Sequence, residues 1–315
     1  MLENGRPLGD PRQMRLSEPH LAGIYPVVPT PFDSEGGLDA ESITRLCAFM
    51  AEQGVQGVTV LGVMGEAQKL SDVERIDVLR IFRETLSPDL ALVVGVSGAA
   101  TDPVVAAAGA AVRAGADALL VGPIPSQDDE IIFQYYQRVA GAVEIPIVIH
   151  DYPASTGVVM SARFIARLHE GIRNVPYVKL EDPPTGPKID KVRELTNGEM
   201  GIFGALGGLY AFEELDRGAI GLMTGFAYPE LLVEIYRRFM AGDRDGAAQV
   251  FYDILPLIRF EFQPSLGVAL RKHVLVKRGV FRTAAVRHPG REVDAKTVEH
   301  LNRILDYLRV RGYDV

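Results

Sequence analysis

The chain of 315 residues lacks several features that mark other classes of protein. It has a single cysteine, Cys47, so no disulfide can form within the chain. No apolar run approaches the ~20 residues that a membrane-spanning helix needs. There is no basic block, and the net charge is -8, so the electrostatic signature of a protein that binds nucleic acid or an anionic membrane is missing. We therefore expect a small-molecule ligand, with no nucleic acid and no membrane as partner.

Signals for metals and cofactors are also missing. The six histidines, among them His20, His150 and His169, show no metal-ligand spacing. The segment "VPTPFDSEGG" after the first strand candidate is not a dinucleotide fingerprint. We expect neither a metal nor a cofactor. Residues 1–20 are polar and rich in proline and glycine, without the apolar core of a signal peptide, which predicts a flexible extension of a cytoplasmic protein.

From Gly23 onward, short apolar runs alternate with longer amphipathic segments, as in a parallel sheet covered by helices. The runs are apolar throughout, which is typical of strands buried on both faces. Eight such units favour a (β/α)8 TIM barrel over a doubly wound sheet. We place the barrel at 21–241 and a C-terminal helical region at 242–315. The strand candidates are 23–29, 57–62, 90–96, 117–122, 146–150, 176–180, 200–205 and 220–225.

The segments between the strand candidates have helical spacing. Ser71, with Glu74 three positions later, matches a capping box at the start of one of them. The expected helices of the barrel include 41–53, 72–86, 102–114, 129–142 and 162–169, and those that follow the eighth strand are 229–241, 243–258, 266–277 and 295–309.

The stretch "NVPYVKLED" carries one lysine, Lys179, near the end of an apolar run. TIM-barrel enzymes place their sites at the C-terminal ends of the strands. A desolvated lysine there is disfavoured as an ammonium ion, and the neutral amine can attack a carbonyl to form an imine. A lysine at a strand end can equally be solvated and paired with Glu181 or Asp182. The residues alone leave both interpretations open.

Three motifs, "LGVMGEAQKLSDVER", "IHDYPASTG" and "VPYVKLED", occur in this order. With them, the chain from Leu21 onward resembles the dihydrodipicolinate synthase/N-acetylneuraminate lyase family of class I aldolases. The resemblance implies a TIM barrel and a homotetramer. It also implies that Lys179, which stands at the position of the family's catalytic lysine, forms a Schiff base with a 2-oxo acid.

The resemblance also assigns the glycine-rich turn "GVMGE", in which backbone N–H groups are expected to hold the substrate carboxylate. Val63 and Met64 replace two hydroxyl residues of the family, the first of which belongs to a proton relay with a tyrosine. Anion binding by the backbone survives this change, but the relay does not. The expected substrate-binding residues of this turn are Gly62, Val63, Met64, Gly65 and Glu66.

His150 stands where the family has that tyrosine. A histidine with an ordinary pKa of ~6.5 can donate or accept a proton near neutrality, so we expect His150 to be the second catalytic residue. Tyr152 is less suited, because it lies two positions later. Asp151 and Glu181 are further candidates for acid–base chemistry and substrate binding. Gly204 is expected to line the site after the seventh strand.

Ser155 occupies the position at which dihydrodipicolinate synthases carry an arginine for their second substrate. We expect Ser155 to contact the substrate and true synthase activity to be absent. The segments "DYPAS", "GLMTG" and "LPLIRFE" resemble the family's sugar-acid dehydratase branch. The prediction is a lyase that forms a Lys179 Schiff base and dehydrates a 2-keto-3-deoxy sugar acid. A pyruvate-dependent aldolase and a non-catalytic protein that binds 2-oxo acids are the alternatives.

Overall fold

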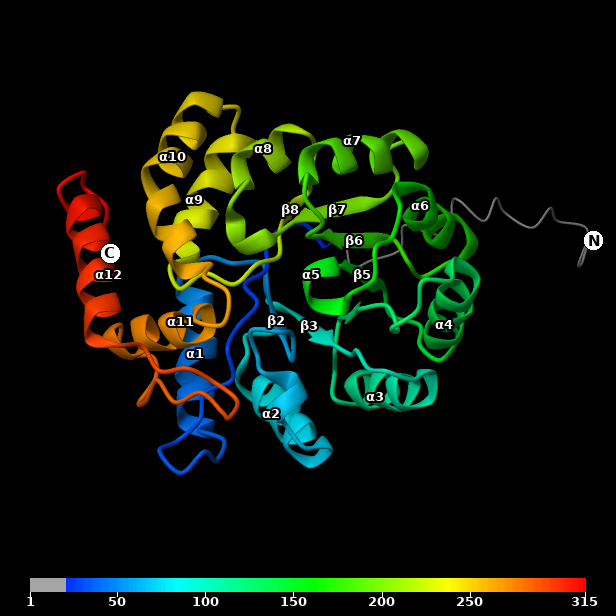
Figure 1. Cartoon of the computed structure of the whole chain (residues 1–315), viewed down its shortest axis with the longest axis horizontal. Coiled ribbons are helices and arrows are strands. Elements are labelled where there is room, and N and C mark those ends of the chain that lie inside the picture. Colours follow the sequence, from blue (N-terminus) through cyan, green and yellow to red (C-terminus); the bar gives the residue numbers. More distant parts are fainter. Residues whose placement is uncertain (1–20) are drawn as a thin grey trace, which may run out of the picture.

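The computed structural model describes residues 21–315 and contains a barrel of eight parallel strands surrounded by helices (Figure 1). Neighbouring strands pair in the order β1-β8-β7-β6-β5-β4-β3-β2, and a bridge between Val27 and Thr59 joins β1 to β2. The predicted (β/α)8 fold is confirmed, whereas the predicted extension 1–20 lies outside the described residues. The strands are β1 (Gly23–Ile24), β2 (Gly57–Val60), β3 (Ala91–Gly95), β4 (Ala118–Val121), β5 (Ile147–Asp151), β6 (Tyr177–Leu180), β7 (Gly201–Gly204) and β8 (Gly221–Leu222).

Helices α1 to α4 and α6 occupy the segments that the amphipathic spacing predicts. The capping box of Ser71 and Glu74 opens α2 as expected. Helices α5, α7 and α8 were not among the expected segments. The helices up to the eighth strand are α1 (Ala40–Glu52), α2 (Asp72–Thr85), α3 (Thr101–Arg113), α4 (Asp129–Gly141), α5 (Pro153–Thr156), α6 (Ala162–Gly171), α7 (Thr185–Leu195) and α8 (Ala211–Asp216).

The first predicted strand, 23–29, is much shorter in the structure. Pro26 and Pro29 have no N–H group to donate to a ladder, so the regular strand ends at Ile24. Beyond it the pairing continues through single hydrogen bonds, such as those from Tyr25 to Leu222 and from Val27 to Thr224. Gly221 lets β8 approach β1 closely, because a Cβ at that position would overlap the carbonyl oxygen of Gly23.

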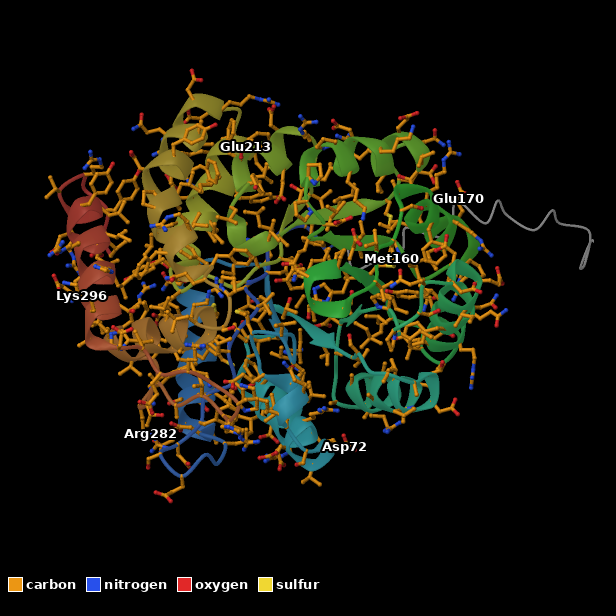
Figure 2. The ribbon with its side chains drawn as sticks, in the orientation of Figure 1. Asp72, Met160, Glu170, Glu213, Arg282 and Lys296 are labelled. Atoms are coloured by element: carbon orange, nitrogen blue, oxygen red, sulfur yellow. The ribbon has the colours of Figure 1, made fainter. Side chains whose placement is uncertain are left out.

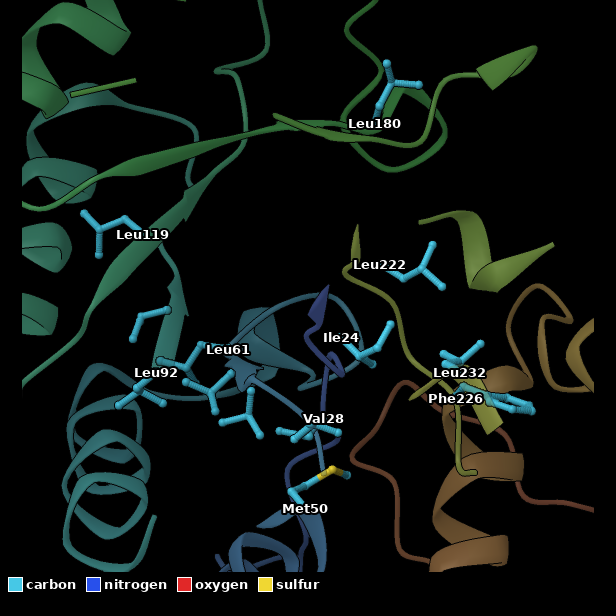
Figure 3. Close-up of a cluster of buried hydrophobic side chains, with 14 of the residues drawn as sticks. Ile24, Val28, Met50, Leu61, Leu92, Leu119, Leu180, Leu222, Phe226 and Leu232 are labelled. Atoms are coloured by element: carbon cyan, nitrogen blue, oxygen red, sulfur yellow. The ribbon is translucent and has the colours of Figure 1, made fainter. Parts of the chain in front are cut away.

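Side chains of successive strand residues point alternately into the barrel and out toward the helices. Figure 3 shows part of the outer layer, which includes Ile24, Leu92, Leu119, Leu180 and Leu222. A separate cluster fills the barrel interior, with Tyr25, Val27, Val93, Leu120, Val148, Tyr177 and Phe203 among its members. This alternation decides which residues at the strand ends can reach a central site.

Four helices follow β8: α9 (Pro229–Met240), α10 (Arg244–Glu261), α11 (Gly267–Lys277) and α12 (Ala295–Arg309). Helix α10 packs against α9, α11 and α12, and Figure 1 shows α10 to α12 along one side of the barrel. Whether 242–315 is a unit of its own stays a prediction. Charged side chains such as Asp72 and Lys296 lie on the outer helices (Figure 2). Within residues 21–315, no helix has the length and apolar character to cross a membrane.

Candidate active site

The register of β5 and β6 brings His150 and Lys179 together. The two residues are direct cross-strand partners. Val148 and Tyr177, two positions earlier on each strand, belong to the interior cluster, so His150 and Lys179 face the barrel interior as well. The Lys179 Nζ atom lies 3.3 Å from Nε2 of His150. A histidine and a lysine are thus adjacent at the C-terminal ends of two neighbouring strands.

Glu181 links these two side chains. Its Oε2 atom accepts a short hydrogen bond from Nζ of Lys179 and lies 2.8 Å from Nε2 of His150. Its Oε1 atom accepts the backbone N–H of Leu206 at 3.1 Å. Lys179, His150 and Glu181 are each no more than 6% exposed. The three side chains form a buried acid–base triad, which we call the Lys179 triad.

The electrostatics of the triad fix two of its charge states. Burial by itself raises the pKa of Glu181, but the charge of Lys179 and the hydrogen bond from His150 outweigh it and lower the pKa to about 2. Burial and the charge of Lys179 lower the pKa of His150, against the opposing influence of Glu181. Near neutral pH, Glu181 is therefore a carboxylate and His150 a neutral imidazole. At any moment Nε2 either donates to Glu181 or accepts from Lys179.

The predicted anion-binding turn has three N–H groups without a backbone acceptor. Within the turn, the N–H of Gly65 donates to the carbonyl of Gly62 at 3.0 Å, and the N–H of Glu66 donates to the carbonyl of Val63 at 3.2 Å. The N–H groups of Gly62, Val63 and Met64 have no backbone acceptor among residues 21–315. The N–H groups available to a carboxylate are therefore those of Gly62, Val63 and Met64.

Glu66 points away from the cavity. Its carboxylate accepts hydrogen bonds from Nζ of Lys272 at 2.6 Å and from Nζ of Lys69 at 2.8 Å. It also accepts the backbone N–H of Arg287 at 3.1 Å. These partners come from the segment after the turn, from α11 and from the loop that follows α11. Glu66 therefore anchors the turn to the C-terminal region, and the structure does not place its carboxylate at the substrate.

Three further predicted substrate-binding residues lie outside the cavity. Asp151 points outward between β5 and α7, where it pairs with Lys188 at 2.6 Å, and burial raises its pKa to about 6. Gly204 also faces outward, because a Cβ there would overlap the carboxylate of Glu214. Ser155 is exposed on α5. For Asp151 and Gly204 the physical reason is strand alternation, which turns residues adjacent to inward-facing positions outward.

Residues from both ends of the chain line the cavity around the triad. Phe262 and Arg271 come from the C-terminal helices and were not predicted from the sequence. Arg271 is 3% exposed. Its segment "LRKH" has the charged composition of an exposed helix surface, so the local sequence gives no sign that Arg271 is buried. Residues 21–315 contain no cluster of histidine, cysteine, aspartate and glutamate suited to a metal ion. The lining residues are Val27, Gly62, Val63, Met64, Leu120, His150, Tyr152, Lys179, Glu181, Gly207, Thr224, Gly225, Phe262 and Arg271.

Residues 20–308 match the dihydrodipicolinate synthetase family. The chain belongs to this family. It is 33% identical over 293 residues to an L-2-keto-3-deoxyarabonate dehydratase of Azospirillum brasilense, which covers 89% of this chain and 92% of the relative. It is 30% identical over 246 residues to a 4-hydroxy-tetrahydrodipicolinate synthase of Methanothrix thermoacetophila, over 76% of this chain and 81% of the relative.

A solved structure gives the same assignment. The crystal structure of dihydrodipicolinate synthase from Rhodopseudomonas palustris superposes with a TM-score of 0.87 at 35% identity, over 91% of this chain and 97% of that chain. Members of the dihydrodipicolinate synthase family are lyases and aldolases that act on small molecules. The similar proteins are named for different reactions, a dehydratase and a synthase. Family membership therefore establishes the class of enzyme, and the particular reaction has to be inferred from the residues of the site.

Proposed function

We propose that this member of the dihydrodipicolinate synthase family dehydrates a short 2-keto-3-deoxy sugar acid through a Schiff base on Lys179. The observation that carries the proposal is the Lys179 triad, in which an imidazole stands beside the lysine inside the barrel mouth. The similarity to a 2-keto-3-deoxyarabonate dehydratase supports the same reaction class. By analogy with the family, we also propose a cytoplasmic homotetramer that needs no cofactor.

Substrate binding begins at the turn 62–66. The free N–H groups of Val63 and Met64 hold the C1 carboxylate, and this orients the C2 carbonyl toward Lys179. A backbone site of this kind needs no hydroxyl side chain, so the valine and methionine of this turn are compatible with it.

Imine formation requires the neutral amine of Lys179. Its proton moves to Oε2 of Glu181 or to Nε2 of His150, which are the two groups in contact with Nζ. The amine then adds to C2, and the hydroxyl of the carbinolamine takes that proton back and leaves as water, which gives the protonated imine and restores Glu181 as carboxylate and His150 as neutral imidazole. Glu181 remains next to the positive charge and stabilises it in the buried site.

Dehydration starts from this imine, which acidifies the hydrogens on C3. His150 as neutral imidazole removes a C3 proton and becomes imidazolium, and the electron pair forms an enamine. The enamine expels the C4 hydroxyl, which takes the proton from His150 and leaves as water. Tautomerisation and hydrolysis of the imine then release the product and restore Lys179.

A pyruvate-dependent aldolase is the second candidate, and one observation favours it. Tyr152 lines the cavity beside His150, with ring centroids 5.8 Å apart, so a phenol is present near the position where an aldolase needs a base at the C4 hydroxyl. Burial raises the pKa of Tyr152, which makes the phenolate harder to form. The imidazole is therefore the better base near neutral pH. A non-catalytic 2-oxo acid binding protein is the third candidate, and it predicts binding without turnover.

Product analysis tests the proposal. Incubation with 2-keto-3-deoxypentonate should yield 2,5-dioxopentanoate and water with little pyruvate. Equal amounts of pyruvate and glycolaldehyde would establish the aldolase instead. Pyruvate with borohydride should add one reduced imine per chain at Lys179, and Lys179→Arg should abolish both trapping and turnover, because arginine stays protonated. Binding of these acids with neither an adduct nor turnover would identify a non-catalytic protein.

A further inference from the structure

Arg271 is a buried cation in the cavity for which the proposed reaction has no role. It lies on α11 and lines the same cavity as Lys179, Val63 and Met64. Only 3% of the residue is exposed. A charged side chain is seldom buried to this extent unless its hydrogen bonds are satisfied.

The partners of Arg271 leave donors unused. Its Nη1 atom contacts the thioether sulfur of Met64 at 2.7 Å, and a thioether is a weak acceptor. Its Nε atom lies 3.3 Å from Oε2 of Glu261. Its Nη2 atom is buried and has no hydrogen-bond partner among residues 21–315. Since a guanidinium has five N–H donors, this arrangement leaves room for oxygen atoms of a ligand.

Charge balance indicates which oxygen atoms these are. Glu261 already faces the guanidinium, and it also accepts the backbone N–H of Ala227 at 3.1 Å. Burial raises the pKa of Glu261 to about 7, against the opposing charge of Arg271. Above this pH Glu261 is ionised and counters the positive charge of Arg271, so a neutral hydroxyl then suits the remaining donors better than a second carboxylate does.

The remaining lining residues offer few competing donors. The C1 carboxylate is assigned to the N–H groups of Val63 and Met64, and much of the lining is apolar, including Val27, Leu120 and Phe262. Among the cavity side chains that the reaction does not use, Arg271 therefore has the greatest number of donors. In the proposed binding mode C1 lies at the turn 62–66 and C2 at Lys179, which leaves the part of the substrate beyond C4 to meet Arg271.

We propose that Arg271 is a specificity residue that donates hydrogen bonds to hydroxyl oxygens on the substrate tail, beyond C4. The inference rests on the proposed function, because it takes a 2-keto-3-deoxy sugar acid as the ligand. Such contacts favour a hydroxylated 2-oxo acid over pyruvate, which has the same carboxylate and carbonyl but no tail.

Comparison of these two ligands tests the assignment. In Arg271→Met, borohydride trapping of pyruvate should stay within about threefold of the wild type. Competition of 2-keto-3-deoxypentonate against this trapping should weaken by about 10- to 100-fold, as expected for the loss of a hydrogen bond to a charged group. Arg271→Met leaves the buried Glu261 without its ion-pair partner. The double variant Arg271→Met/Glu261→Gln removes both charges, so it tests the loss of Arg271 without an unpaired carboxylate. Arg278→Met is the matched control, because Arg278 pairs with Glu230 outside the cavity, and it should leave both ligands unaffected.

Two results would overturn the assignment. An equal loss of pyruvate trapping and of pentonate competition would mean that Arg271 holds the shared carboxylate or the turn around Met64. Unchanged competition in both Arg271 variants would mean that the substrate tail does not reach α11. Failure of the proposed function is distinguishable from these outcomes, because it appears in the wild type as no adduct on Lys179. In that case calorimetric titration gives the dissociation constants of pyruvate and of 2-keto-3-deoxypentonate for the wild type and the Arg271 variants. Equal changes in the two constants would contradict the proposed role of Arg271.

Discussion

His150 and Lys179 are direct neighbours across β5 and β6, with Nε2 and Nζ 3.3 Å apart. In a parallel sheet, side chains at paired positions stand on the same face. The strand pairing therefore places the imidazole of His150 next to the amine of Lys179, and no loop is needed to position either group. Glu181 follows on the same face of β6 and contacts both groups. Two short strand ends therefore supply the whole Lys179 triad.

Replacement of the histidine should affect chemistry and leave binding intact. We expect His150→Phe to lower kcat by about 10²–10⁴-fold, which is the usual contribution of a general acid or base, while borohydride trapping at Lys179 is retained. Steady-state kinetics with 2-keto-3-deoxypentonate measures the effect. Tyr152→Phe is the comparison variant and should change kcat by much less. A large loss in Tyr152→Phe together with an unchanged kcat in His150→Phe would assign the acid–base role to the phenol.

The pH dependence of kcat should reflect the lowered pKa of His150. Because burial and the charge of Lys179 lower this pKa, the neutral base persists below the ordinary value of ~6.5. As pH falls from 8, kcat should stay level through ~6.5 and decline only at more acidic values. A stopped assay in buffers of constant ionic strength gives the profile. A decline that is centred above ~6.5 would show that another group controls the acidic limb.

The carboxylate-binding turn should tolerate a new side chain but not the loss of an N–H group. Met64→Pro removes one of the N–H donors proposed to hold the carboxylate, so pyruvate should trap at least tenfold less efficiently, as expected for a hydrogen bond to a charged group. Val63→Thr keeps every N–H group of the turn and should trap pyruvate as the wild type does. The concentration of pyruvate that gives half-maximal labelling measures this. Equal values in the two variants would place the carboxylate elsewhere.

The ion pair between Lys272 and Glu66 should matter for stability. Nζ of Lys272 lies 2.6 Å from Oε1 of Glu66, and the side chains of Lys272 and Glu66 are 0% and 2% exposed. Lys272→Met leaves a buried carboxylate that keeps Lys69 and the N–H of Arg287 as partners. We therefore expect a loss near the lower end of the range of about 3–5 kcal/mol that an unpaired buried charge costs in the free energy of unfolding. Denaturant titration followed by circular dichroism measures the loss. Lys191→Met breaks an exposed pair with Glu194 and should cost less than about 1 kcal/mol. Similar losses of unfolding free energy in the two variants would show that the buried ion pair does not anchor the turn.

The barrel and its central lysine could be predicted from local patterns in the amino-acid sequence. Eight apolar runs separated by amphipathic segments are a local pattern, because strand and helix periodicities come from neighbouring residues. The motifs around Lys179, His150 and the turn 62–66 also lie within short segments, so the family could be recognised from them. Strand alternation was equally available in the sequence. Applied to β5, it places Asp151 outward as soon as His150 is taken as facing inward.

Contacts between residues that are distant in the chain could not be predicted in this way, because they depend on how the elements pack. Glu181 was one of several candidate carboxylates, and its contacts with Lys179 and His150 depend on the register of two strands. The cost of burial and the nearby charges set the protonation states of these groups, and both depend on the packed environment. Arg271 and Lys272 reach the turn 62–66 because α11 packs beside it. No local pattern encodes such contacts, since they arise from how helices far apart in the chain pack together.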